Sequence, residues 1–212
     1  MDAGILPVKR LDKAKARLGA LFGEDHRAEI ARALLTDALA LCTSVEFLRW
    51  WVVSDDDEVL DAAAQRGFTA IRDPGEGLNP AVSTAIAAAS GSGATSVTVV
   101  PVDVPLAWAG DLHDVLDTGA TSDVVVVPSR DGGTNALYLG PPDIMQPRFG
   151  AGSLRDHIHE AERLGLRCAL LSLPRLELDI DTAEDVDAYL AKPKHAASAT
   201  NEVLVRVRSA TA

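Results

Sequence analysis

Cysteine is scarce in this 212-residue chain, which contains only Cys42 and Cys168. Both lie among apolar neighbours, so we interpret them as buried free thiols of a reducing cytoplasm rather than as a disulfide. Two cysteines cannot complete a structural zinc site, and no pair of histidines is spaced to assist them. The chemistry of the chain must therefore depend on other side chains.

Long apolar runs are also missing. The apolar segments fall far short of the roughly 20 residues that cross a membrane. Met1 is followed by Asp2 and not by a basic and then an apolar stretch, so we expect no secretory signal. Hydrophobic residues make up 47% of the chain and charged residues 24%, which is typical of a soluble protein large enough to bury a core. These features predict a cytoplasmic protein with no membrane partner.

Positive charge is in short supply, since 20 Lys and Arg stand against 31 Asp and Glu and the net charge is -11. That balance argues against nucleic acid as a partner. The first 27 residues are the exception, with six basic and four acidic side chains. A basic stretch at the start of an acidic protein suits a small, highly charged anion better than a polymer.

The apolar pattern predicts strands that alternate with helices. The expected strands are 5–8, 48–53, 69–72, 97–100, 123–127, a strand ending at 139, and 167–171; the expected helices are 26–41, one ending near 67, 79–90, 111–116, 153–163 and 182–190. This order predicts an α/β fold with a mostly parallel sheet. The turn before Leu139 has no helix ahead of it, so one strand there is expected to be antiparallel. We predict one domain over 1–192 and a tail over 193–212, in which 202–208 alternates well enough to add an edge strand.

Asp103 comes three residues after the short β-branched run Val97 to Val100, and Pro105 then ends the segment. A buried central strand would therefore deliver a carboxylate to its carboxyl end, the edge at which open α/β sheets bind ligands. The alternative is a strand that ends in an ordinary polar turn.

Two common nucleotide-binding motifs are absent, namely G-x-x-x-x-G-K-[ST] and a G-x-G-x-x-G after the first strand. Instead, the first strand leads into a stretch that contains Lys9, Lys15 and Arg17. Cations in this position can balance a polyphosphate, with Arg giving forked contacts and Lys point charges. The alternative is a solvated basic loop.

Asp179 and Asp181 form a second acidic stretch. In an extended segment their side chains point the same way, and paired carboxylates near phosphates most often hold Mg²⁺. The alternative is that Asp181 or Thr182 simply caps the following helix.

Two glycine-rich turns, 130–135 and 149–153, have backbone N–H groups that can face an anion closely. Ser153 adds a hydroxyl at a helix start, which also favours an anion. The two turns lie far from the basic stretch in sequence, which hints at a second anion site. His157 lies one turn after Ser153 and could assist that site, although a surface or packing histidine is the simpler interpretation.

Taken together and in this order, these pieces resemble the 2-phospho-L-lactate/phosphoenolpyruvate guanylyltransferases, which make the side chain of the redox coenzyme F-420. The resemblance covers about residues 5–190. It rests on Pro7-Val-Lys9, Lys15-x-Arg17-Leu18, Gly77-Leu78-Asn79, Asp103-x-Pro105, Asp131-Gly132-Gly133-Thr134-Asn135, Phe149-Gly150-x-Gly152-Ser153 with His157, and Asp179-x-Asp181-Thr182.

The resemblance implies a three-layer nucleotidyltransferase (Rossmann-like) fold with a mixed sheet and helices on both faces. It also implies a Mg²⁺-dependent transfer of GMP from GTP to phosphoenolpyruvate or 2-phospho-L-lactate. The residues that it implies are Asp103 and Asp181 for the metal; Lys9, Lys15, Arg17 and Asp103 for catalysis; Lys9, Arg17, Gly77, Leu78 and Asn79 for the nucleotide; and Thr134, Asn135, Gly150 and Ser153 for the acceptor. GTP and the acceptor acid are the expected partners, and a homodimer is left open.

The residue chemistry agrees with this activity. A phosphate has its second pKa at about 6, so the acceptor is already ionised near neutral pH and needs no general base. The protein must hold two anions in line and neutralise charge, which a metal, Lys and Arg can do. The alanine- and arginine-rich composition suggests a high-GC bacterium, which in this family favours phosphoenolpyruvate.

Two alternatives remain. The first is a nucleotidyltransferase for a sugar phosphate or a molybdopterin, against which the absence of a G-G-x-S-x-R-M signature speaks. The second is a non-catalytic nucleotide-binding regulator of the same fold, which would bind GTP without releasing pyrophosphate.

Overall fold

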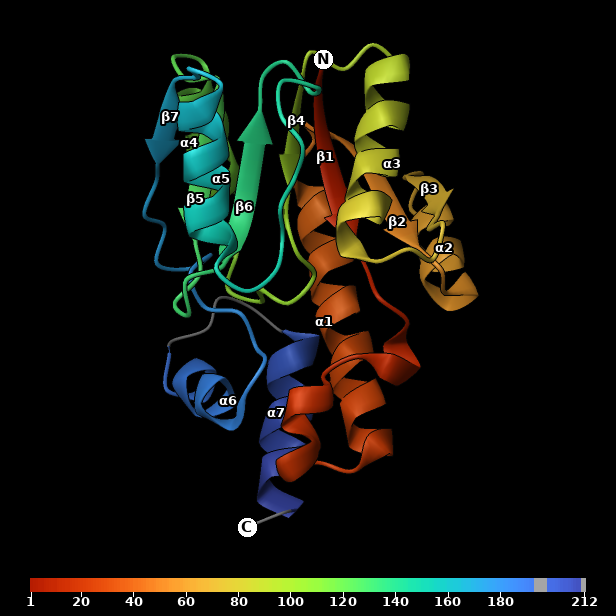
Figure 1. Cartoon of the computed structure of the whole chain (residues 1–212). Helices are drawn as coiled ribbons and strands as arrows, with labels where there is room; N and C mark the ends of the chain where they lie inside the picture. The colour runs from red at the N-terminus through yellow and green to blue at the C-terminus, as the bar shows by residue number, and fades with distance from the viewer. Residues whose placement is uncertain (193–197, 211–212) are drawn as a thin grey trace.

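The computed structural model describes residues 1–192 and 198–210, and in this part of the chain seven strands form one sheet in the order β3-β2-β1-β4-β6-β5-β7 (Figure 1). The strands are β1 (Asp2–Pro7), β2 (Arg49–Ser54), β3 (Thr69–Arg72), β4 (Ser96–Val99), β5 (Val124–Pro128), β6 (Thr134–Leu139) and β7 (Cys168–Leu170). The helices are α1 (Glu24–Ser44), α2 (Asp57–Ala64), α3 (Leu78–Gly91), α4 (Ala109–Gly119), α5 (Ser153–Arg163), α6 (Ala183–Leu190) and α7 (Ala199–Ala210). Two short 3₁₀ helices, η1 (Leu11–Lys13) and η2 (Ala16–Ala20), lie in the stretch that follows the first strand and contains Lys15 and Arg17.

Helices cover both faces of the sheet, as predicted. Helices α1, α2 and α4 pack on one face, and α3 and α5 pack on the other. Strand β5 shows why its sequence is a continuous valine run. Val125 and Val127 point into the first core while Val124 and Val126 point into the second, so both faces of the strand are buried. None of the helices in the described ranges is long and apolar enough to cross a membrane.

Strand β6 runs antiparallel to both of its neighbours, β4 and β5, which confirms the expected reversal. The other strand pairs are parallel. An antiparallel strand begins at the edge where its parallel neighbours end. Thr134, the first residue of β6, therefore lies at the same edge of the sheet as the carboxyl ends of β1 and β4.

A third core lies beyond this edge, where α6, α7 and η2 pack against the first half of α1 (Figure 1). The edge strand predicted over 202–208 is wrong, because this segment belongs to the helix α7. Leu204 and Val207, three residues apart, are buried against this core, whereas Val205 is 49% exposed. Apolar side chains three to four residues apart lie on one face of α7, which packs against the flank of α1. This packing stabilises a helix although the valines also alternate as they would in a strand. Residues 193–197 of the predicted tail lie outside the described ranges.

Candidate active site

A cleft of about 500 Å³ opens at the edge where the parallel strands end. It brings together three regions that are far apart in sequence: the basic stretch (residues 9–17), the acidic cluster (Asp103, Asp179 and Asp181) and the two glycine-rich turns. Among the predicted site residues, the lining contains Lys9, Lys15, Arg17, Leu78, Asp103, Thr134, Asn135, Gly150, Ser153 and Asp181. Gly77 and Asn79 are the predicted residues that the lining does not contain.

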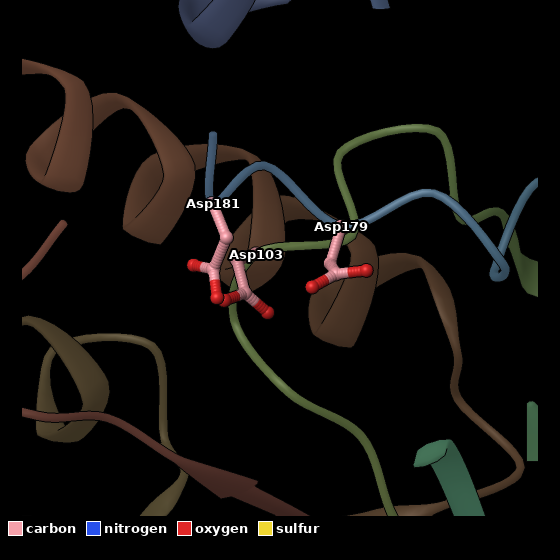
Figure 2. A group of neighbouring side chains, drawn as sticks. All are labelled: Asp103, Asp179 and Asp181. Carbon is pink, nitrogen blue, oxygen red and sulfur yellow. The ribbon is translucent and has the colours of Figure 1, made fainter. Parts of the chain in front are cut away.

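The acidic cluster is built from two loops that are tied together by their backbones. The N–H of Ile180 donates to the carbonyl of Asp103 at 3.0 Å, which sets the loop after β4 beside the segment that leads to α6. One carboxylate oxygen from each of the three aspartates lies within 4.8 Å of the others (Figure 2). The cluster thus contains the two predicted metal ligands and a third carboxylate, Asp179.

The alternative considered from the sequence was that Asp181 or Thr182 caps the following helix. Thr182 has that role in the structure, and the carboxylate of Asp181 does not take part in the cap. The Thr182 hydroxyl accepts from the N–H of Asp185 at 3.3 Å, and the Asp185 carboxylate accepts from the N–H of Thr182 at 2.8 Å. This reciprocal pair caps α6. Asp181 therefore directs its side chain into the cleft, where it meets cations.

Asp179 carries the clearest electrostatic strain in the cluster. Its pKa is raised to about 6, chiefly by burial and also by the nearby carboxylates of Asp103 and Asp181, while a hydrogen bond from Asn135 works in the opposite direction. The Asn135 amide donates to Asp179 at 3.1 Å and to the Leu176 carbonyl at 2.9 Å. Asn135, which is predicted to contact the acceptor, thus donates hydrogen bonds to Asp179 of the acidic cluster and to the backbone of Leu176.

Lys15 neutralises part of this cluster. Its Nζ lies 2.6 Å from Oδ2 of Asp103 and 3.0 Å from Oδ1 of Asp181. Burial alone would lower the pKa of Lys15, but these two carboxylates outweigh it and the pKa is raised. Its backbone φ of 57° is the only positive φ of a non-glycine residue in the described ranges. Such a conformation costs about 1–3 kcal/mol, so the surrounding contacts hold Lys15 in place.

The other predicted triphosphate contacts are freer. Arg17 is 67% exposed and its Nη1 lies 3.6 Å from Oδ2 of Asp181, and Lys9 is exposed at the mouth of the cleft. Both side chains can reach an anion without breaking a buried pair. The sequence pointed to these cations as a group, but only the fold distinguishes Lys15, which is buried among acids, from its exposed neighbours.

The Gly77–Asn79 segment begins helix α3 and adds Leu78 to the cleft wall. The Asn79 amide donates to the Phe149 carbonyl at 3.0 Å, and its carbonyl oxygen accepts from the Phe149 N–H at 2.7 Å. Asn79, which is predicted to lie near the nucleotide, thus binds the backbone of the turn that leads to Ser153 through its side chain.

That turn, residues 149–153, forms one wall of the cleft. Gly150 has a φ of 138°, which strongly favours glycine, and the N–H groups of Gly150, Ala151 and Gly152 have no acceptor among the described residues. Ser153 begins α5, and its hydroxyl donates to the Thr134 hydroxyl at 3.2 Å. The two predicted acceptor hydroxyls are thus in direct contact, although 19 residues separate them.

The acidic cluster fits a hard divalent cation. Its donors are carboxylate oxygens, the ligand type that Mg²⁺ prefers, and one from each aspartate lies within 4.8 Å of the other two. The cleft thus brings together three kinds of groups: carboxylates that could hold a cation, basic side chains, and the backbone N–H groups of a glycine-rich turn.

A mixed sheet with this cleft at its carboxyl edge defines a nucleotidyltransferase fold. A solved structure described as a nucleotide-diphospho-sugar transferase, from Desulfovibrio desulfuricans G20, superposes with a TM-score of 0.81 at 19% identity and covers 98% of this chain and 97% of its own. The manganese complex of Rv0371C from Mycobacterium tuberculosis H37Rv superposes with a TM-score of 0.59 at 16% identity, covering 91% and 99%. The model of the family "Guanylyl transferase CofC like" matches residues 2–208, and the chain belongs to that family.

Three relatives are each 36% identical to this chain. The phosphoenolpyruvate guanylyltransferase of Sphaerobacter thermophilus aligns over 86% of this chain and 89% of its own length. The 2-phospho-L-lactate guanylyltransferase of Methanothermobacter thermautotrophicus aligns over 86% and 81%, and the 3-phospho-D-glycerate guanylyltransferase of Phenylobacterium zucineum over 87% and 88%. The sequence family predicted from the motifs is confirmed.

Proposed function

We propose that this protein transfers GMP from GTP to phosphoenolpyruvate, or to 2-phospho-L-lactate, and releases pyrophosphate. The observation that carries the proposal is the arrangement of the cleft. The basic stretch and the glycine-rich turn at 149–153 line the same cleft as the acidic cluster, so two anions could meet there beside a divalent cation. The product would be a diphosphate that serves coenzyme F-420 biosynthesis.

Each group in the cleft has a defined task in this reaction. Lys9 and Arg17 bind the triphosphate of GTP, and Lys15 holds the acidic cluster together until the substrates arrive. Asp103, Asp179 and Asp181 would hold Mg²⁺, which supplies charge neutralisation on the phosphates when it is bound. The manganese complex of a protein with the same fold supports a divalent ion in this class.

The acceptor binds at the glycine-rich turn and needs no proton removed. Thr134 presents its hydroxyl and Gly150 its backbone N–H to the carboxylate or phosphate of the acid, and Ser153 lies beside them with its hydroxyl donated to Thr134. Since the acceptor phosphate is largely ionised above its second pKa of about 6, its oxygen attacks the α-phosphorus of GTP directly. The bond to the β-phosphate breaks, and the charge leaves on pyrophosphate, where cations stabilise it.

Overall identity does not select the acceptor. The three relatives share the same 36% identity with this chain, yet their names specify three different acids. All three acids have three carbons, one carboxylate and one phosphate. We therefore propose this class as the acceptor, with phosphoenolpyruvate as the first candidate.

Pyrophosphate release from GTP is the direct test. The purified protein is given GTP and Mg²⁺ with phosphoenolpyruvate, 2-phospho-L-lactate or 3-phospho-D-glycerate, and ³¹P NMR identifies the diphosphate product. Glucose 1-phosphate serves as a sugar-phosphate control. Release with one three-carbon acid and not with the sugar phosphate is the expected result. Binding of GTP without release in any mixture would instead support a non-catalytic nucleotide-binding regulator.

A further inference from the structure

His157 lies completely buried on α5, with both ring nitrogens in use. Its Nε2 accepts from the backbone N–H of Arg148 at 2.9 Å, and its Nδ1 lies 3.0 Å from the hydroxyl oxygen of Thr134. One imidazole thus joins the turn at 148–149 to the first residue of β6. From the sequence, a surface or packing histidine is the simpler interpretation of His157; the side chain is buried, and packing alone does not require these two polar contacts.

The Arg148 contact fixes the proton of the ring. A backbone N–H can only donate, so Nε2 must be unprotonated. A neutral imidazole then carries its hydrogen on Nδ1, and that hydrogen is donated to Thr134. Burial lowers the pKa of His157 to about 4, and the opposing effect of Asp156 is smaller. The ring is therefore neutral at ordinary pH and has this single tautomer.

The Thr134 hydroxyl oxygen then accepts two hydrogen bonds, from His157 and from Ser153. A hydroxyl oxygen has two acceptor positions and one hydrogen of its own. With both acceptor positions filled, the Thr134 hydrogen remains for a partner in the cleft, whose wall Thr134 forms. A ligand atom beside Thr134 must therefore be a hydrogen-bond acceptor.

We propose that His157 is a positioning residue that turns the Thr134 hydroxyl into a fixed donor, so that this end of the cleft selects an acceptor oxygen, such as that of a carboxylate or phosphate, over a group that can only donate a hydrogen. The inference rests on the proposed function for the identity of the ligand, a carboxylate or phosphate of the acceptor acid. The inference adds a physical reason for the selection. His157 lies behind the cleft wall and does not touch the ligand, but it fixes the direction in which Thr134 donates its hydrogen.

A spectroscopic test needs neither substrate nor activity. The ¹⁵N chemical shifts of the imidazole rings in the ligand-free protein report which nitrogen carries the hydrogen. We expect His157 to be protonated on Nδ1 and not on Nε2, and exposed His159, two residues away on the same helix, serves as the internal reference. A hydrogen on Nε2 of His157 would overturn the proposal, whatever reaction the protein catalyses.

Two substitutions separate the two contacts. His157→Gln can accept from Arg148 but falls short of Thr134, whereas His157→Asn places an amide donor near the position of Nδ1. We expect His157→Gln to raise the KM for phosphoenolpyruvate by about tenfold or more with kcat and the KM for GTP nearly unchanged, because uniform binding of one ligand is lost. His157→Asn should recover part of this loss. His159→Gln is the matched control and should behave as the wild type.

A double variant shows whether His157 acts through Thr134. In a Thr134→Val background the hydroxyl is gone, so adding His157→Gln should cause little further rise in the KM for phosphoenolpyruvate. Additive losses would overturn the positioning role and leave His157 as a packing residue. Wild-type protein that transfers no guanylyl group to any acid would count against the proposed function, while the NMR result would stand by itself.

Discussion

Nζ of Lys15 lies 2.6 Å from Oδ2 of Asp103, in an ion pair that joins the basic stretch to the end of the central strand β4. The same ammonium contacts Asp181, so it lies between the two predicted metal ligands. A monovalent side chain thus occupies part of the space that a divalent ion would use. Metal binding and release of Lys15 from the carboxylates are therefore expected to be linked.

Replacing Asp103 with Asn tests the metal role of this carboxylate. An amide keeps the shape but removes the charge, so we expect Mn²⁺ binding, followed by electron paramagnetic resonance, to weaken and guanylyl transfer to fall below detection. Asp143→Asn is the matched control, because Asp143 is exposed and absent from the cleft lining. An Asp103→Asn variant that keeps near wild-type activity in Mg²⁺ would contradict the assignment.

Replacing Lys15 with Gln tests the linkage between the ammonium and the metal. Without metal the variant should be less stable by about 3–5 kcal/mol, because breaking a buried pair leaves uncompensated charge. Mg²⁺ should then raise its melting temperature more than that of the wild type, since the ion no longer competes with Nζ. Lys13→Gln removes a charge from the same stretch, and its thermal shift with Mg²⁺ should match the wild type. Equal shifts for all three proteins would show that Lys15 does not oppose the metal.

Arg17 is predicted to contact the triphosphate of GTP. It is exposed and only loosely paired with Asp181, so little is lost when it turns to a ligand. Arg17→Ala should weaken GTP binding by about 1.5–3 kcal/mol, the range for a hydrogen bond to a charged group. Calorimetric titration with GTP measures this, and Arg10→Ala, which removes a cation paired with Asp12 outside the cleft lining, is the control. Unchanged affinity in Arg17→Ala would move the nucleotide elsewhere.

Asp179 should make the metal-free protein less stable as the pH rises. Its pKa is about 6 in the folded protein against an ordinary value of 3.8, so between these values the folded state holds a proton that the unfolded state lacks. Stability therefore falls from about pH 4 to about pH 6 and stays lower above. The shift alone corresponds to about 3 kcal/mol, and solvent screening of this partly exposed side chain reduces the expected loss to roughly 2 kcal/mol. Without metal at about pH 7.5, Asp179→Asn should have a higher melting temperature than the wild type. This pH lies about 1.5 units above the pKa of Asp179. At about pH 4 the melting temperatures of the two proteins should converge. A constant difference across this range would exclude Asp179 as the cause.

The sheet was largely predictable from sequence because apolar runs report burial directly. The valine run predicted strand β5, and the absence of a helix before β6 predicted that β6 is antiparallel to its neighbours. The helix α7 was not predictable, because Leu204 and Val207 fit a helical face while the valines around them also alternate. The segment forms a helix because Leu204 and Val207 pack against the apolar flank of α1, and this tertiary contact cannot be read from the local sequence.

The segments that form the site were predictable from the sequence, but the contacts between their side chains were not. Parallel strands end at one edge, so Asp103 and Lys15 were expected to share a cleft. That the ammonium would lie between carboxylates depends on one backbone conformation, the left-handed φ of Lys15. Likewise, the hydrogen bonds of Asn79 to Phe149 and of Asn135 to Asp179 depend on side-chain directions that packing sets.

The hydroxyls of Thr134 and Ser153 are predicted to bind the acceptor acid and not GTP. Thr134→Val keeps the shape of the side chain and removes the donor, and Ser153→Ala removes the group that donates to Thr134. Both should raise the KM for phosphoenolpyruvate or 2-phospho-L-lactate far more than the KM for GTP, since each change affects one ligand only. Thr134→Val should have the larger effect, because Thr134 supplies the hydrogen that faces the cleft whereas that of Ser153 is directed to Thr134.

Steady-state kinetics with each substrate varied in turn measures these two constants, and Thr84→Val, on an exposed helix position, is the matched control. A crystal soaked with phosphoenolpyruvate should place a carboxylate or phosphate oxygen within hydrogen-bond distance of Thr134 or Ser153. Density for the acid against Lys9 and Arg17 alone, with the turn at 149–153 empty, would defeat the model with two anion sites. The glycine-rich turns would then serve to shape the edge of the sheet, and the acceptor would have to share the cations with GTP.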